Sequence, residues 1–262
     1  MQVIAIIQAR MSSSRLPGKV LLKINNKAIL EHIYQNLNKL KLIDKVIVAT
    51  STDKTDERLV NFCKKKKMNY YKGSLKNVLK RFVDIIKIYK PKFIIRVTAD
   101  SPIIDLKILN FYIKNMKKFN TDCTFFSHKT TLLTGYDIFS SDLLKKAIKN
   151  SSQVRDKEHV GSFYIRKNIN KFNTLKIVIP KSLRSSKYKI SIDTLEDYTN
   201  IKKLIELNKI SKINLSKIIK IMKKNKYNIF NHKKGNESLD NKTYKKIKIN
   251  KNIYNKKLLL KI

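Results

Sequence analysis

The sequence predicts an α/β fold in which helices cover both faces of a mostly parallel sheet. Between residues 3 and 119, short apolar stretches alternate four times with longer segments whose apolar residues recur every three or four positions. These patterns are typical of buried strands and of amphipathic helices. The first stretch, Val3 to Ile7, is apolar throughout and rich in β-branched residues, which suits a strand buried on both faces. Alternating strands and helices indicate a parallel sheet, since each strand-helix-strand unit places its helix on a face of the sheet.

The predicted elements follow in order from these patterns. Strands are expected at residues 3–7, 45–50, 68–71, 93–98 and 122–126. Helices are expected at residues 29–40, 56–67, 75–89 and 105–116. Acidic or small polar residues stand where three of these helices begin, as first-turn or capping residues: Asp56 and Glu57, Ser74, and Asp105.

The alternation loosens beyond residue 126. Residues 134–190 are expected to form a small inserted subdomain with its own strands and a helix from Asp156 to Lys167. A strand at residues 188–192 then leads into a helix capped by Thr194, and a short basic helix runs from Asn214 to Lys224. We therefore expect one domain over residues 1–225, followed by a basic tail over residues 226–262 that is only partly ordered.

The net charge of +40 (59 basic minus 19 acidic residues) would ordinarily suggest binding to nucleic acid. However, only eight of the 59 basic residues are arginine, and the lysines are spread over every segment together with many Ile and Asn residues. This distribution fits a compositional trend of the whole chain better than a local binding surface. Nucleic acid is therefore not the expected partner, although the charge attracts anionic nucleotides at low salt.

The remaining composition indicates a reduced, cytoplasmic protein. No run of about 18 apolar residues is present, so no membrane span is expected. The N-terminus leads directly into a strand and lacks the basic and apolar regions of a signal peptide. Cys63 and Cys123 lie far apart in apolar surroundings, which indicates buried free thiols and neither a disulfide nor a metal site.

The loop after the first strand combines small hydroxyl residues with three cations, Arg10, Arg15 and Lys19, and ends at Pro17-Gly18. In open α/β sheets, ligands bind at the carboxyl ends of the strands. Arginine forks, a lysine ammonium and free backbone N–H groups bind polyanions, so we expect a triphosphate here. A solvated basic loop is the alternative interpretation. The loop contains two of the only eight arginines in the chain, which favours its interpretation as a binding loop.

Two aspartates stand at the ends of predicted strands, Asp100 after residues 93–98 and Asp193 after residues 188–192. If both strands run parallel to the first, both carboxylates lie at the same sheet edge as the basic loop. Two carboxylates, completed by phosphate oxygens and water, are a common ligand set for Mg²⁺. The alternative is that each aspartate only caps the element that follows it.

Residues 6–11, Ile-Ile-Gln-Ala-Arg-Met, and residues 15–21, Arg-Leu-Pro-Gly-Lys-Val-Leu, are similar to the N-terminal signature of a known family. That family is the sugar-acid cytidylyltransferases, and the resemblance is closest to its SpsF branch of spore coat polysaccharide biosynthesis proteins. Residues 96–105 resemble its Arg-Ile-Thr-Gly-Asp-Cys-Pro-Leu-Ile-Asp stretch, with Ala99 in place of glycine, and residues 192–197 resemble its Val-Asp-Thr-Pro-Glu-Asp stretch. The resemblance runs from Val3 to about Lys224 and implies a Rossmann-like fold of the nucleotide-diphospho-sugar transferase (GT-A-like) type.

The resemblance also implies roles for individual residues. Asp100 and Asp193 would bind the catalytic Mg²⁺, and Arg10 and Lys19 would act in catalysis. Residues expected to bind the nucleotide are Ala9, Arg10, Ser12, Ser13, Arg15, Lys19, Thr50, Ser51, Gly73, Ser74, Thr98 and Ala99. Residues expected to contact the sugar are Asp137, in a shortened version of a Gly-rich acidic segment, and Glu158 and His159, which match an Arg-Glu-His-Val motif. Homodimerisation is implied by the resemblance alone.

The predicted reaction is the transfer of CMP from CTP to an acidic sugar, a nonulosonic acid or related 2-keto sugar acid, with release of pyrophosphate. The product would serve the synthesis of a surface polysaccharide or other glycan. Two other classes remain open from sequence. A glycosyltransferase would use a nucleotide-sugar on a similar sheet, but the Asp-x-Asp motif common in such enzymes is not found at a strand end here. A nucleic-acid-binding module would account for the charge but not for the positions of Asp100 and Asp193.

Overall fold

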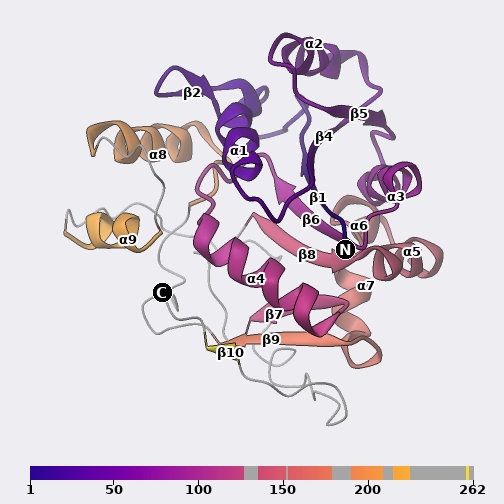
Figure 1. Cartoon of the computed structure of the whole chain (residues 1–262). Coiled ribbons are helices and arrows are strands. Elements are labelled where there is room, and N and C mark those ends of the chain that lie inside the picture. The colour runs from indigo at the N-terminus through magenta and orange to yellow at the C-terminus, as the bar shows by residue number, and fades with distance from the viewer. Residues whose placement is uncertain (127–134, 152, 179–189, 209–214, 225–257, 260–262) are drawn as a thin grey trace.

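In the computed structural model, residues 1–126, 135–151, 153–178, 190–208, 215–224 and 258–259 are described. They form one eight-stranded sheet surrounded by helices (Figure 1). The order of its strands is β10 (Leu258–Leu259), β9 (Thr174–Val178), β7 (Cys123–Phe126), β8 (Tyr136–Ser140), β6 (Phe93–Thr98), β1 (Val3–Gln8), β4 (Lys45–Ser51) and β5 (Tyr70–Gly73). Among these strands, only β8 runs antiparallel to its neighbours. The predicted fold class is confirmed.

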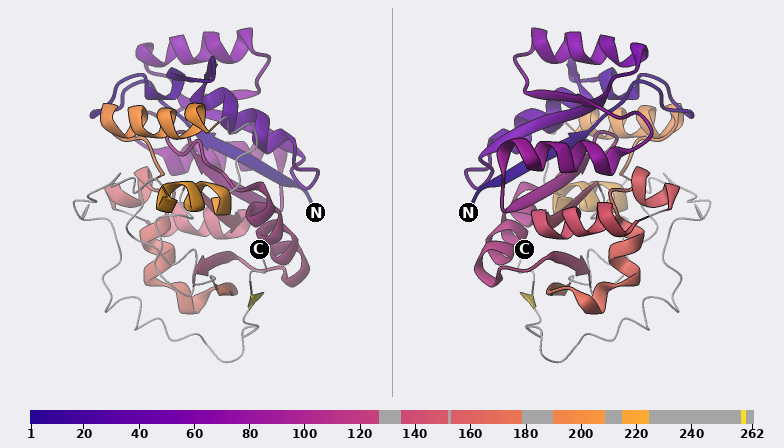
Figure 2. Two further views of the ribbon diagram at one scale, coloured as in Figure 1. Left: turned by 90° about the vertical axis from the view of Figure 1, so that its left-hand side faces the viewer. Right: turned by 90° about the vertical axis from the view of Figure 1, so that its right-hand side faces the viewer.

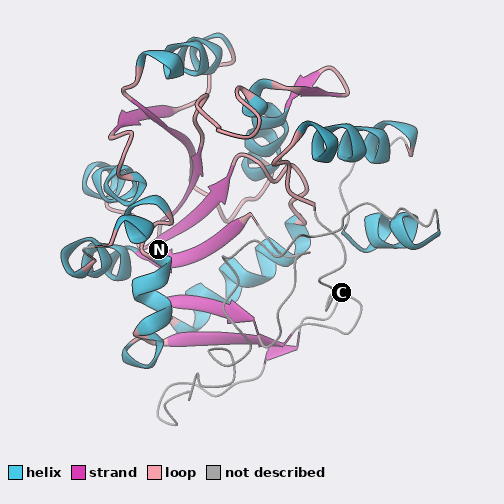
Figure 3. Ribbon diagram, turned by 180° about the vertical axis from the view of Figure 1, so that it is seen from behind, coloured by secondary structure: helices cyan, strands magenta, loops and turns pink. Residues whose placement is uncertain are grey.

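Helices cover both faces of the sheet (Figures 1 and 3). One face packs against α1 (Ile29–Asn38), α2 (Glu57–Lys65), α4 (Leu106–Phe119), α8 (Leu195–Leu207) and α9 (Leu215–Lys224). The other packs against α3 (Val78–Tyr89), α5 (Ser141–Asn150) and α7 (Ser162–Lys167), with α6 (Val154–Glu158) beside α3. Figure 2 shows the molecule from two opposite sides, and in its left panel α8 and α9, in orange, lie nearest the viewer. Smaller elements complete the description: η1 (Lys19–Leu21), β2 (Lys23–Ile24), β3 (Lys27–Ala28), η2 (Lys54–Asp56) and η3 (Ile169–Lys171).

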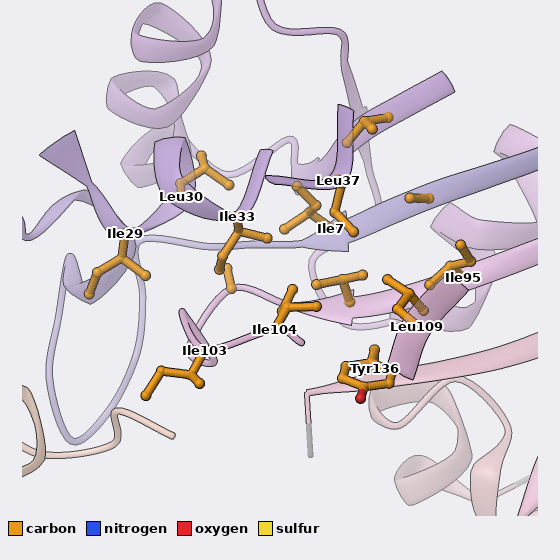
Figure 4. Packing of buried hydrophobic residues seen from close by; sticks show 14 of the residues in the cluster. Ile7, Ile29, Leu30, Ile33, Leu37, Ile95, Ile103, Ile104, Leu109 and Tyr136 are labelled. Atoms are coloured by element: carbon orange, nitrogen blue, oxygen red, sulfur yellow. The ribbon is translucent and has the colours of Figure 1, made fainter. Parts of the chain in front are cut away.

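The apolar run of β1 explains why this strand lies in the interior of the sheet, between β6 and β4. Its side chains alternate between the two cores, Val3, Ala5 and Ile7 on one side and Ile4 and Ile6 on the other, and all five are fully buried. Figure 4 shows Ile7 among side chains of α1, α4 and β6. Because β1 pairs in parallel with both β4 and β6, the loops that follow these strands leave at the same edge of the sheet.

The strands within residues 134–190, expected to belong to an inserted subdomain, join the main sheet. β8 lies between β6 and β7, and β9 pairs in parallel with β7. The strand expected at residues 188–192 is wrong for residues 190–192, which are irregular. Residues 188 and 189 lie outside the described part of the chain. Of the basic tail, only β10, which pairs with β9, is described.

The single helix expected from Asp156 to Lys167 is instead two short helices, α6 and α7. Val160 and Gly161 lie between them in the left-handed region, with φ of 55° and 72°. This conformation costs a β-branched residue roughly 1–2 kcal/mol. Val160 is nevertheless completely buried, so its packing in the core stabilises the break between the two helices. The sequence pattern does not predict this break.

Side-chain caps define where several helices begin. Asp105 accepts hydrogen bonds from the N–H groups of Lys107 and Ile108 at the start of α4, as predicted. Thr194 and Asp197 form a complete capping box at α8. The cap expected from Ser74 is wrong: Asn77 caps α3, and the Ser74 hydroxyl accepts a hydrogen bond from the Asn77 N–H.

Both cysteines are free and buried, as the sequence predicts. Burial raises the pKa of the Cys63 thiol to about 12 and also raises the pKa of Cys123. None of the helices in the described part of the chain combines the length and apolar character that a membrane span requires.

Asp105→Ala should destabilise the protein strongly, because Asp105 joins two elements. Its second carboxylate oxygen accepts a hydrogen bond from the Leu215 N–H of α9 at 3.0 Å, so removal leaves three N–H groups without their acceptor. We expect a loss of about 2–4 kcal/mol in the free energy of unfolding, measured by urea denaturation.

Asp142→Ala is the matched control, since Asp142 is exposed and its only ion pair in the described structure is with Lys145. It should change the free energy of unfolding by less than about 0.5 kcal/mol. Equal effects of the two substitutions would contradict the role given to Asp105.

Candidate active site

The basic loop after β1 is closed by its own backbone. The Met11 carbonyl accepts hydrogen bonds from the N–H groups of Ser13 and Gly18, both at 2.9 Å. Gly18 has a φ of 70°, a left-handed conformation that glycine adopts without strain. The loop therefore doubles back at Gly18, and Lys19 begins η1 directly after this turn.

Asp56, on η2, ties this loop to the end of β4. Its Oδ1 accepts a hydrogen bond from the Met11 N–H at 2.6 Å, and its Oδ2 accepts from the N–H and hydroxyl of Ser51. The carboxylate is completely buried. The sequence suggested only a helix-start role for Asp56, because a residue that anchors a distant loop leaves no local pattern.

Asp100 and Asp193 converge, although by a route that differs from the prediction. Asp100 follows β6 as expected, whereas Asp193 lies in an irregular segment just before α8. The Ile192 N–H donates to the Asp100 carbonyl at 2.7 Å, which places the two aspartates side by side. The Asp193 N–H in turn donates to Asp197 at 2.8 Å, so the α8 capping box also holds Asp193.

Lys19 lies between the two carboxylates. Its Nζ is 3.4 Å from Asp100 Oδ2 and 3.3 Å from Asp193 Oδ1, and it donates to the Ile192 carbonyl at 2.7 Å. Arg15 Nη2 also donates to Asp193 Oδ1, at 2.9 Å, from a more exposed position. The structure thus brings two of the three loop cations and both predicted metal ligands together.

A second polar cluster lies across β1, β6 and β8. Arg96 donates from Nη1 to Asp137 Oδ2 at 2.7 Å and from Nε to Gln8 Oε1 at 2.9 Å. Arg96 and Asp137 are direct neighbours in the register of β6 and β8. Arg96 therefore neutralises the charge of Asp137, which is predicted to contact the sugar. Arg96 itself is not among the site residues predicted from the sequence.

Glu158 and His159 lie at the end of α6. Arg10 Nη2 contacts Glu158 Oε1 at 3.5 Å, and both side chains are about half exposed. The His159 ring packs edge-on against Phe163, with ring centroids 5.6 Å apart. The structure thus links Glu158 to the basic loop through Arg10, and gives His159 an aromatic neighbour on α7.

The residues predicted to bind the nucleotide lie at the carboxyl ends of four adjacent strands, with Ser12 and Ser13 in the basic loop. Ala9 follows β1, Thr50 and Ser51 end β4, Gly73 ends β5 and Thr98 ends β6, with Ser74 and Ala99 next in the chain. The Ser51 hydroxyl is already bonded to Asp56. The Thr50 hydroxyl is buried and has no hydrogen-bond partner in the described structure. Sheet topology therefore collects these residues at one edge, while the Ser51 side chain serves the framework.

Arg81, on α3, is a buried cation that the sequence-based assignment missed. It donates to the carbonyls of Ser74 (2.6 Å), Leu75 (3.1 Å) and Ala49 (3.3 Å), and only 1% of the residue is exposed. Burial lowers its pKa, partly offset by Asp56, while the charge of Arg10 lowers it further. Arg81 thus fixes the loop after β5 against β4. The scarcity of arginine, which drew attention to the basic loop, could have identified Arg81 and Arg96 as well.

Arg81→Met should lower stability by about 2–4 kcal/mol, because three buried carbonyls lose a charged donor. The neighbouring Lys80→Met is the matched control, since Lys80 is paired with Asp84 at the surface. It should cost no more than about 0.5 kcal/mol. Urea denaturation measures both, and a small loss in Arg81→Met would show that the loop does not depend on these bonds.

Comparisons with known proteins show what the chain is similar to. The cytidylyltransferase family model matches residues 4–246. The chain is 36% identical over 210 residues to an uncharacterized protein of Methanocaldococcus jannaschii (80% of this chain, 84% of the relative). It is 32% identical over 208 residues to the spore coat polysaccharide biosynthesis protein SpsF of Bacillus subtilis (78% and 86%). A solved cytidylyltransferase of Leptospira borgpetersenii superimposes with a TM-score of 0.76 at 30% identity, covering 88% of this chain and 98% of that one.

Proposed function

The chain belongs to the cytidylyltransferase family, and we propose that this CTP-using nucleotidyltransferase transfers CMP to an acidic sugar, a nonulosonic acid or related 2-keto sugar acid. The anomeric hydroxyl oxygen attacks the α-phosphorus and loses its proton to solvent. The bond from that phosphorus to the bridging oxygen breaks, and pyrophosphate leaves. The observation that carries this proposal is the convergence of Lys19, Arg15, Asp100 and Asp193 at the carboxyl edge of the sheet.

The cations of the basic loop act on the triphosphate. Negative charge builds up on the departing pyrophosphate, and preorganised cations stabilise charge of this kind in phosphoryl and nucleotidyl transfer. Lys19 and Arg15 already lie at the acidic pair, and Asp56 fixes the loop that carries them. Arg10 reaches toward α6, where Glu158 lies. This arrangement would hold the β- and γ-phosphates beside the α-phosphorus.

The acidic pair fits a divalent ion, for which we propose Mg²⁺. Two carboxylates and the Ile192 carbonyl face one ammonium, which supports a site where these oxygens share a cation. No group of three or more His, Cys, Asp or Glu side chains able to hold a metal occurs among the described residues. Mg²⁺ suits such a two-carboxylate site because it keeps several waters and completes its shell with phosphate oxygens. When bound by Asp100 and Asp193, it would neutralise charge on the α-phosphate.

The sugar site would lie beside the Arg96 and Asp137 pair. An unpaired Asp137 would repel an acidic sugar, but its ion pair with Arg96 leaves a carboxylate that can accept hydrogen bonds from sugar hydroxyls. Glu158 and His159 would contact the same sugar from α6. The name of the SpsF relative supports a product destined for a surface polysaccharide.

A substrate panel tests the proposal directly. Each of the four nucleoside triphosphates is combined with several acidic sugars and with a neutral sugar, and pyrophosphate release is measured. We expect release with CTP and an acidic sugar, at least about tenfold faster than with the other nucleotides or the neutral sugar. A nucleotide-sugar incubated with an acceptor should give no transfer. Absence of pyrophosphate in every combination would contradict the proposal.

Asp100→Asn should fold normally and show little turnover at any Mg²⁺ concentration. The substitution keeps the size of the side chain but removes one of the two carboxylates, and losses of about 100-fold or more are typical when a charge-stabilising group is removed. Asp142→Asn, on the exposed surface of α5, is the control and should keep full activity. Near-normal turnover by Asp100→Asn would remove this residue from the proposed metal site.

A further inference from the structure

The geometry points to a second role for Lys19, which rests on the proposed function. Its ammonium is the counter-ion of both Asp100 and Asp193, and it lies among the oxygens that a divalent ion would bind. Lys19 is thus a positioning residue for the acidic pair as well as a ligand of the triphosphate. The metal consequently binds well only together with the nucleotide, which draws Lys19 away.

The surroundings of the Lys19 ammonium are those of a cation site. In the described part of the chain, its hydrogen-bond and ion-pair partners are oxygens of Asp100 (3.4 Å), Asp193 (3.3 Å) and the Ile192 carbonyl (2.7 Å). The lysine side chain is only 11% exposed, which makes it more enclosed than either carboxylate. Hard divalent cations prefer the same donors, carboxylate and carbonyl oxygens. The ammonium and the metal would therefore compete for one set of oxygens.

Electrostatics explains why the acidic pair needs this counter-ion. The Ile192–Asp100 backbone hydrogen bond and the α8 capping box hold the backbones of Asp100 and Asp193 near each other, and both carboxylates face the Lys19 ammonium. Two carboxylates that share one cation repel each other, and salt screens partly buried charges poorly. Lys19 contacts both carboxylates and so reduces their repulsion, whereas Arg15 contacts Asp193 from a more exposed position.

The competition couples nucleotide binding to metal binding. The triphosphate offers Lys19 a stronger anionic partner, and when Lys19 moves to it the carboxylates become available to the metal. Because linkage is reciprocal, the metal must then also strengthen nucleotide binding, by the same factor. The enzyme avoids holding a metal tightly in the absence of nucleotide.

Direct Mn²⁺ binding, followed by electron paramagnetic resonance without nucleotide or sugar, tests this inference. We expect Lys19→Met to bind Mn²⁺ at least about tenfold more tightly than the wild type, since a competing unit charge within 4 Å is removed. Lys19→Arg keeps the charge and should show no such gain. The double variant Lys19→Met/Asp100→Asn should lose the gain, because one of the two carboxylates is absent.

Two controls test whether net charge or misfolding could account for a change in Mn²⁺ affinity. Lys23→Met removes one exposed lysine of β2, so it reports the effect of net charge alone and should change Mn²⁺ affinity less than about twofold. Circular dichroism checks folding. If Lys19→Met is unstable, Lys19→Gln replaces it, and Mn²⁺ should raise the melting temperature of either variant more than that of the wild type.

The inference is overturned if Lys19→Met binds Mn²⁺ no more tightly than the wild type or Lys23→Met. It is also overturned if Lys19→Arg gains as much as Lys19→Met, because the gain would then not depend on the charge. Pyrophosphate release by the wild-type enzyme separates this result from the proposed function. If the wild type transfers CMP while Lys19→Met shows no gain, only the second role of Lys19 is wrong.

Discussion

The parallel direction of β5, β4, β1 and β6 is the constraint on which the candidate site depends. β1, β4 and β6 are short and mostly buried and apolar, so they are stable only within a sheet covered on both faces, whereas β5 is the more exposed edge strand. The parallel arrangement sends the loop after every strand to the same edge. Residues that are far apart in sequence, such as Ala9, Thr50, Gly73 and Asp100, thereby lie at one edge of the sheet.

Sheet topology alone does not fix the loops at this edge, and buried charged side chains do so instead. Asp56 binds the basic loop to β4 through backbone N–H groups, and Arg81 binds the loop after β5 through carbonyls. Asp105 connects α4 to α9 in the same manner. A buried charge that loses such partners pays a large desolvation cost, so each anchor strongly favours one loop conformation. The loops can therefore be precise although they carry few apolar residues.

The central strands and the helices packed on them could be predicted from sequence because their apolar periods reflect burial directly. For the loops at the site, the sequence predicts which residues they contain but not how those residues are arranged. Asp193 shows the reason: it reaches Asp100 through one backbone hydrogen bond from Ile192, and no periodic pattern encodes such a contact. The break at Val160 was missed for a related reason, since a valine in a left-handed conformation contradicts its own preference. Arg96 and Arg81 follow the same rule, because their partners come from other strands and loops and no local pattern marks such contacts.

The same composition makes the acidic residues more informative than the basic ones. With 59 basic residues in the chain, a lysine at any position requires no special explanation, whereas an acidic residue is one of only 19. Four aspartates with little exposure, Asp56, Asp105, Asp156 and Asp197, each accept hydrogen bonds from backbone N–H groups and so serve the framework. Asp100 and Asp193 differ from them, because their carboxylates face a lysine ammonium. This difference in partners, two carboxylates around one ammonium instead of around backbone N–H groups, supports the metal-ligand role that we propose for Asp100 and Asp193.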